Sequence, residues 1–382
     1  MPTFSTAGRV VVGAGEAEHA AALVASLGRR ALVVAGGHAD VDVLVRAAGH
    51  ELDEVHVWRR RGEPDVAGVR AGVEVARAFG PDVVVGWGGG SVLDTAKAVA
   101  ALHRGTGDVL DHLEVVGRGL PLPAPGTPVV AVPTTSGTGA EVTANAPVLV
   151  PEHGVKASLR GPALLPALAL VDPVLTLGCP PAVTAASGAD ALTQCLEAFT
   201  TPAATPLTDP LALDGLVRAG RSLARAATRG DDLDARTDMS LAALLSGMAL
   251  ANARLGAVHG LAAALGGAVH AGHGEICAAV LVATTAANVA ALRRSDPDGD
   301  ALRRYARAAQ ALTGRPTAGA DDAAPWLRDA LAPLGLRGLR ALGLDDAAVP
   351  DVARAALAAS SMRGNPVTLT PAEVEDVLRA SA

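Results

Sequence analysis

Residues 82–91 read Asp82-Val83-Val84-Val85-Gly86-Trp87-Gly88-Gly89-Gly90-Ser91, and an apolar segment with helical spacing continues from them to Ala101. A continuous apolar run that ends in glycines, directly before a helix, predicts a strand, a turn and a helix. Missing side chains allow a phosphate to approach the backbone, and the helix start adds unpaired N–H groups. We therefore expect a phosphate group at this turn; a tight turn without a ligand is the alternative.

Around this stretch, short β-branched runs alternate with amphipathic segments, which is the pattern of a largely parallel α/β sheet. From about Pro180 the periodicity changes from 2 to 3.6, and the segments become rich in alanine and leucine. We therefore expect an α/β domain at residues 1–178 and an all-helical domain at residues 179–382. The expected strands are 9–12, 31–34, 54–58, 82–85, 129–132, 148–150 and 167–171, all in one sheet; the expected helices are 16–27, 65–79, 92–101, 180–200, 210–227, 238–253, 260–269, 275–292, 300–312 and 351–361.

The composition narrows the classes of function. At 382 residues the chain exceeds the size of one hydrophobic core, and half of its residues are hydrophobic, so two folded domains are expected. A net charge of -7 offers no basic surface for nucleic acid or for an anionic membrane. The N-terminal Met1 to Thr6 does not resemble a signal peptide, and no apolar run reaches the roughly 20 residues of a spanning helix. We therefore expect a cytoplasmic protein.

Two rare residue types carry information. Cys179, Cys195 and Cys277 are an odd number and widely spaced, so we expect reduced thiols that fill apolar space. Lys97 and Lys156 are the only lysines in a chain whose other basic residues are arginines. Such a lysine can be one that arginine cannot replace, because an ammonium and a guanidinium make different contacts; two ordinary surface lysines are the alternative.

A second loop strengthens the case for a nucleotide. Pro133-Thr134-Thr135-Ser136-Gly137-Thr138-Gly139-Ala140-Glu141 follows its own buried strand and is dense in hydroxyl groups and glycine. It is suited to cover the other side of a dinucleotide. Two such loops at strand ends in one sheet predict a binding crevice.

The segments 88–97 and 133–143 resemble the two nucleotide-loop signatures of the iron-containing (group III) alcohol dehydrogenase family, and the resemblance extends to Ser360–Pro366. It implies a Rossmann-like α/β N-terminal domain plus an all-α C-terminal domain, a dehydroquinate synthase-like architecture with cofactor and metal in the cleft. Lys156 would reach the ribose or phosphate side of the cofactor, whereas Lys97 would be structural. The other cofactor contacts implied at matching positions are Gly89, Gly90, Ser91, Asp94, Thr134, Thr135, Thr138 and Leu175.

Four polar residues of the helical domain are candidate metal ligands. Asp190 and Gln194 are four residues apart on one helix face, and His259 and His273 flank a glycine-rich stretch. An aspartate, an amide oxygen and two imidazoles suit a divalent transition metal. Spacing alone is equally explained by hydrogen-bonded histidines and by a carboxylate in a first helical turn. The resemblance of 188–194 and 256–274 to the family's metal segments implies that all four bind Fe²⁺ or Zn²⁺.

Two positions depart from the family pattern. The family usually has histidine where this chain has Gln194, and an amide oxygen binds late transition metals less tightly than imidazole. The family also has a histidine where this chain has Ala263, which removes the usual relay for the alcohol proton. His270 or a chain of solvent molecules are the candidate replacements.

The resemblance implies an NAD(P)-dependent alcohol dehydrogenase or aldehyde reductase and, as we expect, a homodimer. A metal held by Asp190, His259 and His273 would polarise the oxygen of an alcohol, aldehyde or ketone, while a hydride moves between the substrate carbon and the nicotinamide. A dehydroquinate synthase-like lyase is disfavoured because the chain has two lysines. A metal-free relative, such as a maleylacetate reductase or a binding protein, stays an alternative. With seven aromatic residues in the chain, an aromatic-lined substrate pocket is not expected.

The end of the second expected strand bears on cofactor choice. NAD-selective dinucleotide folds place an acidic residue there, which would repel a 2′-phosphate. This chain has Gly36-Gly37-His38 instead, which leaves room and backbone N–H groups for a phosphate. Asp40 argues the other way, since a small shift of the turn would bring its carboxylate to the ribose. We expect NADPH to be accepted at least as well as NADH.

Overall fold

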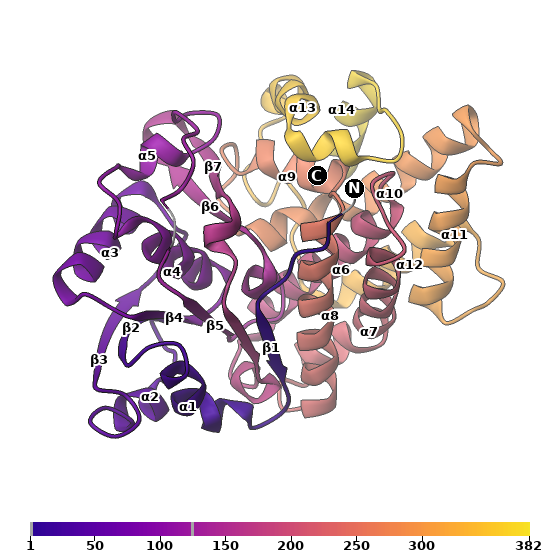
Figure 1. Ribbon diagram of the computed structural model, residues 1–382. Coiled ribbons are helices and arrows are strands. Elements are labelled where there is room, and N and C mark those ends of the chain that lie inside the picture. The colour runs from indigo at the N-terminus through magenta and orange to yellow at the C-terminus, as the bar shows by residue number, and fades with distance from the viewer. Residues whose placement is uncertain (1–2, 124–125) are drawn as a thin grey trace. The chain divides into compact units, whose positions relative to one another are not determined.

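The structure is a computed structural model that describes residues 3–123 and 126–382, so Met1 and Pro2 of the N-terminal stretch lie outside the described residues (Figure 1). The chain forms two compact units. The α/β unit consists of Ser5–Thr135 and Gly139–Leu177. The helical unit consists of Gly178–Ala382 together with Ser136–Thr138, Thr3 and Phe4.

The α/β unit is built on a six-stranded sheet in the order β1-β8-β5-β4-β2-β3, in which all neighbouring strands are parallel. The central strands are apolar along their whole length because helices cover both faces of a parallel sheet. Every residue of β4 and β5 is buried. The strands are β1 (Arg9–Val12), β2 (Arg30–Gly36), β3 (Glu54–Arg60), β4 (Val83–Gly88), β5 (Val129–Pro133) and β8 (Leu168–Val171).

Local signals set the ends of the helices in this unit. The carboxylate of Asp65 accepts a hydrogen bond from the backbone N–H of Gly68 at 2.6 Å and so caps the N-terminus of α3. Gly80, with a φ of 67°, caps the C-terminus of the same helix. The single helix expected at residues 16–27 is a 3₁₀ turn, Glu16–His19, followed by the short α1. The helices are α1 (Ala20–Ala25), α2 (Asp42–Arg46), α3 (Val66–Phe79), α4 (Gly90–Leu102) and α5 (Val109–His112).

The expectation that residues 148–150 join the main sheet is wrong. They belong to β6 (Asn145–Val150), which pairs with β7 (Val155–Arg160) in a separate antiparallel hairpin. The turn contains Gly154 with a φ of 60°, a conformation that favours glycine. Burial alternates along β6, so one face of the hairpin packs against the core beside α3 and α4 while the other is partly exposed.

The helical unit contains no strand anywhere in residues 178–382, all of which the structure describes. The expected architecture, a Rossmann-like α/β part followed by an all-α part, is therefore confirmed. One hydrophobic cluster, rich in alanine and leucine, joins helices from α6 to α14. The helices are α6 (Pro181–Thr200), α7 (Thr208–Thr228), α8 (Leu233–Asn252), α9 (Ala257–Leu265), α10 (His273–Ser295), α11 (Asp300–Thr313), α12 (Ala323–Leu331), α13 (Val349–Ala358) and α14 (Pro371–Ala380).

Helix α10 is the one described helix that is by itself long and apolar enough to cross a membrane, with a mean hydropathy of 1.7 over its best window. In the structure 61% of that window is buried against the other helices of the unit. A core helix of a folded domain passes the same test of length and composition, so α10 is weak evidence for a membrane span.

Candidate metal centre and nucleotide-binding loops

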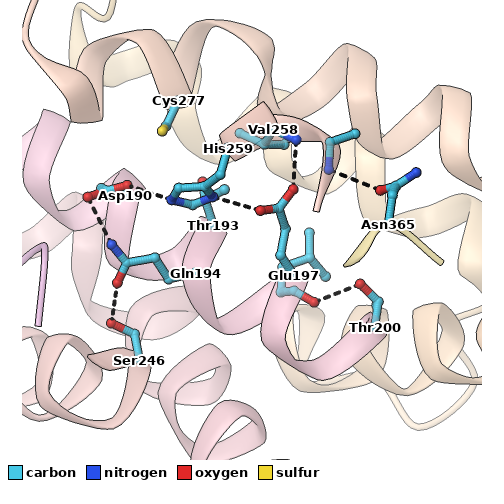
Figure 2. Close-up of polar contacts among 12 residues, drawn as sticks. Asp190, Thr193, Gln194, Glu197, Thr200, Ser246, Val258, His259, Cys277 and Asn365 are labelled. Carbon is cyan, nitrogen blue, oxygen red and sulfur yellow. Dashed lines mark hydrogen bonds and ion pairs between the residues drawn. The ribbon is translucent and has the colours of Figure 1, made fainter. Parts of the chain in front are cut away.

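Four side chains from three helices of the helical unit converge on one point, and Figure 2 shows three of them, Asp190, His259 and Cys277. Asp190 lies in the middle of α6, and His259 lies in the first turn of α9, which begins three residues earlier than expected. His273 is the first residue of α10, and Cys277 follows it one turn later. One ligand atom from each of the four lies within 4.8 Å of the others. The predicted meeting of Asp190 with the two histidines is thus present in the structure.

Two atoms of this cluster are buried without a hydrogen bond in the described part of the chain. They are Asp190 Oδ1 and His259 Nε2, which lie 3.4 Å apart. His273 Nε2 lies 3.8 Å from the same carboxylate oxygen. A buried polar atom without a partner costs about 1–3 kcal/mol. A divalent cation bound between these atoms would satisfy both, so the donor set fits a metal.

Glu197 holds His259 in place, and the sequence analysis missed it. Its Oε2 lies 2.6 Å from His259 Nδ1, and its Oε1 accepts a hydrogen bond from the backbone N–H of Val258 at 2.7 Å (Figure 2). A carboxylate on one ring nitrogen directs the other nitrogen toward a metal. The available signal was the spacing, since Glu197 follows Asp190 by seven residues and lies on the same face of α6.

Charge in the buried cluster shifts two pKa values. Burial lowers the pKa of His259, but Glu197 and Asp190 outweigh that effect and raise it to about 10. Burial raises the pKa of Asp190, but His273, His259 and Cys277 outweigh it and hold that pKa below its usual range. The carboxylate of Asp190 therefore stays ionised and presents a negative charge to the point of convergence.

Gln194 is next to this cluster with both of its polar atoms engaged. Its Nε2 donates to Asp190 Oδ2 at 3.0 Å, and its Oε1 accepts from the hydroxyl of Ser246 at 2.7 Å (Figure 2). In this arrangement the amide positions the carboxylate of Asp190, and the carbonyl oxygen is turned to Ser246. The prediction that Gln194 is a metal ligand gains no support from this geometry and stays a prediction. His270 is exposed and is not a member of the cluster.

The two glycine- and threonine-rich loops meet at one edge of the sheet in the α/β unit. They follow β4 and β5, which are neighbours. The backbone N–H of Thr134 donates to the carbonyl of Gly88 at 3.0 Å. A Cβ placed on Gly89 would lie 3.3 Å from the side chain of Thr135, so the turn is closely covered. The predicted cofactor residues Gly89, Gly90, Ser91, Thr134 and Thr135 are therefore brought together, with the N-terminus of α4 among them.

The buried side chain of Lys97 links helix α4, which follows the first loop, to the second loop. Its buried ammonium donates to Asp94 Oδ1 at 3.0 Å, to the carbonyl of Ala140 at 2.9 Å and to Thr143 Oγ1 at 3.1 Å. These partners come from α4 and from the loop after β5. Burial raises the pKa of Asp94, and Lys97 acts against that rise. Three acceptors around one point suit an ammonium better than a planar guanidinium.

Three other predicted cofactor residues are Lys156, Leu175 and Thr138, and the charge of Lys156 acts to lower the pKa of Asp94. Lys156 pairs through Nζ with Glu63 Oε2 at 2.7 Å. Leu175 packs against the core that includes β1 and β8. Thr138 belongs with Ser136 to the helical unit, where Ser136 Oγ lies 3.1 Å from Ser240 Oγ. Their roles toward a cofactor stay predictions.

The Gly36–Gly37 turn lies beside the glycine turn of β4. Strand β2 pairs with β4, and a Cβ placed on Gly36 would lie 3.8 Å from Cα of Gly88. Strand β3, which follows β2 in the chain, lies on one side of the neighbouring strands β2 and β4, and β5, which follows β4, lies on the other side. The boundary between β2 and β4 is therefore the topological switch point of the sheet. A Cβ on Gly37 would lie 2.7 Å from Nε of Arg61, so a guanidinium rests against the turn.

Known proteins share both units. Residues 7–173 match the iron-containing alcohol dehydrogenase model, and residues 184–382 match the C-terminal model of the Fe-containing alcohol dehydrogenase family. The chain is 36% identical to the probable alcohol dehydrogenase EutG of Salmonella typhimurium, over 84% of this chain and 78% of the relative. It is 36% identical to the 4-hydroxybutyrate dehydrogenase of Cupriavidus necator, over 83% and 82%. A solved 1,3-propanediol oxidoreductase matches the full length of both chains with a TM-score of 0.88 and 30% identity. This chain therefore belongs to the iron-containing alcohol dehydrogenase family, whose members are NAD(P)-dependent, metal-containing oxidoreductases that act on alcohols.

Proposed function

We propose that Asp190, His259 and His273 hold one divalent metal in the helical unit and that the α/β unit binds NAD(P)(H), so that the enzyme interconverts a small alcohol and its aldehyde or ketone. The observation that supports this most strongly is the buried ion pair of Asp190 Oδ1 and His259 Nε2 at 3.4 Å, in which neither atom has a hydrogen bond. A metal bound there supplies a Lewis acid for the substrate oxygen. The domain roles proposed are dinucleotide binding by residues 1–178 and metal and substrate binding by residues 179–382.

Each protein group has a defined task in this proposal. Asp190 offsets the charge of the cation, and Glu197 fixes the tautomer and orientation of His259 through the 2.6 Å contact. The turn at Gly89 and the N-terminus of α4 offer backbone N–H groups to the pyrophosphate. The hydride itself is carried by the nicotinamide, so the protein's contribution is position and electrostatics.

For the cofactor we propose that NADPH is accepted at least as well as NADH. The turn that would meet the adenosine ribose carries Gly36 and Gly37 and is flanked by the guanidinium of Arg61, which is suited to a 2′-phosphate. The competing carboxylate, Asp40, already accepts a hydrogen bond from the backbone N–H of Asp42 at 2.9 Å. That bond holds it at the start of α2.

If the protein were a metal-free reductase, the residues at this cluster would be expected to differ from the metal donors that are present. A reductase without a metal has no need for a buried carboxylate oxygen that faces one buried and one partly exposed imidazole, which is what Asp190, His259 and His273 provide. We also propose that the protein forms a homodimer and that it lies in the cytoplasm. These two proposals rest on the composition and on the family resemblance.

The test combines metal analysis with turnover of a panel of aldehydes, using NADPH and NADH. The parent enzyme should contain close to one equivalent of metal and should reduce at least one short aldehyde. His259→Ala should lose the metal and nearly all turnover while its circular dichroism spectrum stays unchanged, because the helix itself remains intact. His19→Ala, a change at an exposed histidine of the α/β unit, is the matched control and should behave like the parent. Full activity of His259→Ala would rule the assignment out.

A further inference from the structure

Cys277 lies in the cluster in a way that its sequence context does not predict. It follows His273 by four residues on α10, so both side chains lie on one face of that helix. It is fully buried, and its Sγ lies 3.6 Å from His273 Nε2. Figure 2 shows Cys277 beside Asp190 and His259. All three cysteines are expected from the sequence to be apolar fillers, and Cys277 differs from that expectation because its thiol lies within 4.8 Å of three other donors.

Three donor–donor distances in the cluster are close to those of a tetrahedral metal site. Two donors that each lie about 2.1 Å from a metal at the tetrahedral angle are separated by about 3.4 Å, and a sulfur at about 2.3 Å widens that separation to about 3.6 Å. The structure has 3.4 Å between Asp190 Oδ1 and His259 Nε2, and 3.8 Å between that oxygen and His273 Nε2. The 3.6 Å between Cys277 Sγ and His273 Nε2 equals the value expected for a shared metal.

The other candidates for a fourth donor are engaged elsewhere. The amide oxygen of Gln194 accepts from Ser246 at 2.7 Å. Cys195 is equally buried, but its thiol faces the carbonyl of Ala242 at 3.9 Å, and burial raises its pKa. Cys179 is partly exposed and lies before α6. Among the three cysteines, none of which forms a disulfide and all of which lie within the described residues, only Cys277 reaches the cluster.

We infer that Cys277 supplies a thiolate as the fourth ligand of the metal centre, in the place left by the absence of a histidine at position 194. The inference rests on the proposed metal role of Asp190, His259 and His273. Metal binding would release the thiol proton to solvent and form the metal–sulfur bond, with no change of oxidation state. An oxygen, two imidazoles and a soft thiolate favour Zn²⁺ and Co²⁺ over the harder Mg²⁺ and Mn²⁺.

Cobalt substitution tests this with a readout that is independent of turnover. The full-length parent loaded with one equivalent of Co²⁺ should show near-ultraviolet thiolate-to-cobalt charge-transfer absorption beside the visible bands of the metal. Cys277→Ala and Cys277→Ser should keep the visible bands at saturating Co²⁺ but lose the charge-transfer band. Their Zn²⁺ affinity should fall by about tenfold or more, since even residues that only orient ligands are worth that factor. Cys195→Ala, which removes another buried thiol, is the matched control and should keep the band.

The outcomes separate this inference from the function on which it rests. A charge-transfer band that persists in both Cys277 variants, or stoichiometric Co²⁺ in the parent without any such band, would overturn the thiolate ligand and leave the proposed metal centre standing. Co²⁺ binding that His259→Ala does not weaken would overturn the metal centre and Cys277 with it. If the Cys277 thiol serves only as a hydrogen-bond partner of His273, both variants will retain the parent spectrum.

Discussion

Replacing Glu197 by glutamine probes how much the orientation of His259 contributes to metal binding. The carboxylate accepts two hydrogen bonds, from His259 at 2.6 Å and from the backbone N–H of Val258 at 2.7 Å. A glutamine has one carbonyl oxygen, so Glu197→Gln can keep only one of these bonds and turns its NH₂ group toward the other donor. The variant also removes the negative charge that makes the imidazole a stronger donor.

The expected loss follows from the burial of the pair. Both side chains are about nine-tenths or more buried, so the contact is a short, charge-assisted hydrogen bond of about 1.5–3 kcal/mol with little solvent screening. Outer partners of metal-ligating histidines are worth about 10–100-fold in metal affinity. We expect Glu197→Gln to weaken Zn²⁺ or Co²⁺ binding by that factor, with turnover restored in part by excess metal.

Competition with a fluorescent chelator measures the affinity, and thermal unfolding of the metal-free protein checks the fold. Glu275→Gln is the matched control: it is the same chemical change two residues after His273, but both oxygens of Glu275 pair with Arg337 near the surface. The control should bind metal like the parent, because an exposed ion pair contributes at most about 1 kcal/mol. A Glu197→Gln affinity within about twofold of the parent would refute the positioning role of Glu197.

Three further predictions concern other parts of the molecule. Gln194→His should slow the loss of metal to a chelator, because the side chain at this position ends 3.0 Å from the carboxylate of Asp190 and imidazole binds late transition metals better than an amide; equal rates would place residue 194 outside the coordination sphere. Arg61→Gln should raise KM for NADPH more than KM for NADH, and a parent catalytic efficiency with NADH more than roughly tenfold above that with NADPH would contradict the proposed phosphate site at Gly37. Burial raises the pKa of Glu141 from 4.5 to about 7, so the unfolded chain releases this proton first and the folded state loses up to roughly 3 kcal/mol of stability as pH rises between those values. Glu141→Gln should therefore raise Tm over the parent more at pH 8 than at pH 5, and an equal difference at both pH values would show that Glu141 is ionised in the folded protein.

The architecture was predictable where periodicity and glycine placement act on neighbouring residues. The run before Gly88 is a buried strand because a parallel sheet is apolar on both faces, and the change to a period of 3.6 after Pro180 marks the helical unit. The hairpin of β6 and β7 was not predictable in the same way. A short β-branched run is compatible with either sheet, and the choice depends on packing against α3 and α4.

The metal cluster shows a similar limit. Family resemblance pointed to Asp190, His259 and His273, but the only local signal for Glu197 is its spacing from Asp190, and its partner His259 is 62 residues away in the chain. From the sequence alone Cys277 is indistinguishable from a buried apolar filler. In the structure α10 begins at His273, so the side chains of His273 and Cys277 lie on one face of the same helix. Lys97 is the converse case: its rarity in the sequence indicated a special contact, and its three acceptors in the structure supply one.

Anomalous X-ray scattering from crystals of the Zn²⁺-loaded enzyme, recorded on both sides of the zinc absorption edge, would locate the metal. We expect one peak at the point where Asp190 Oδ1, His259 Nε2, His273 Nε2 and Cys277 Sγ converge, about 2.0–2.3 Å from each of these atoms. A peak of full occupancy at any other site, or no peak between Asp190 and His259 in protein that contains one equivalent of zinc, would contradict this expectation.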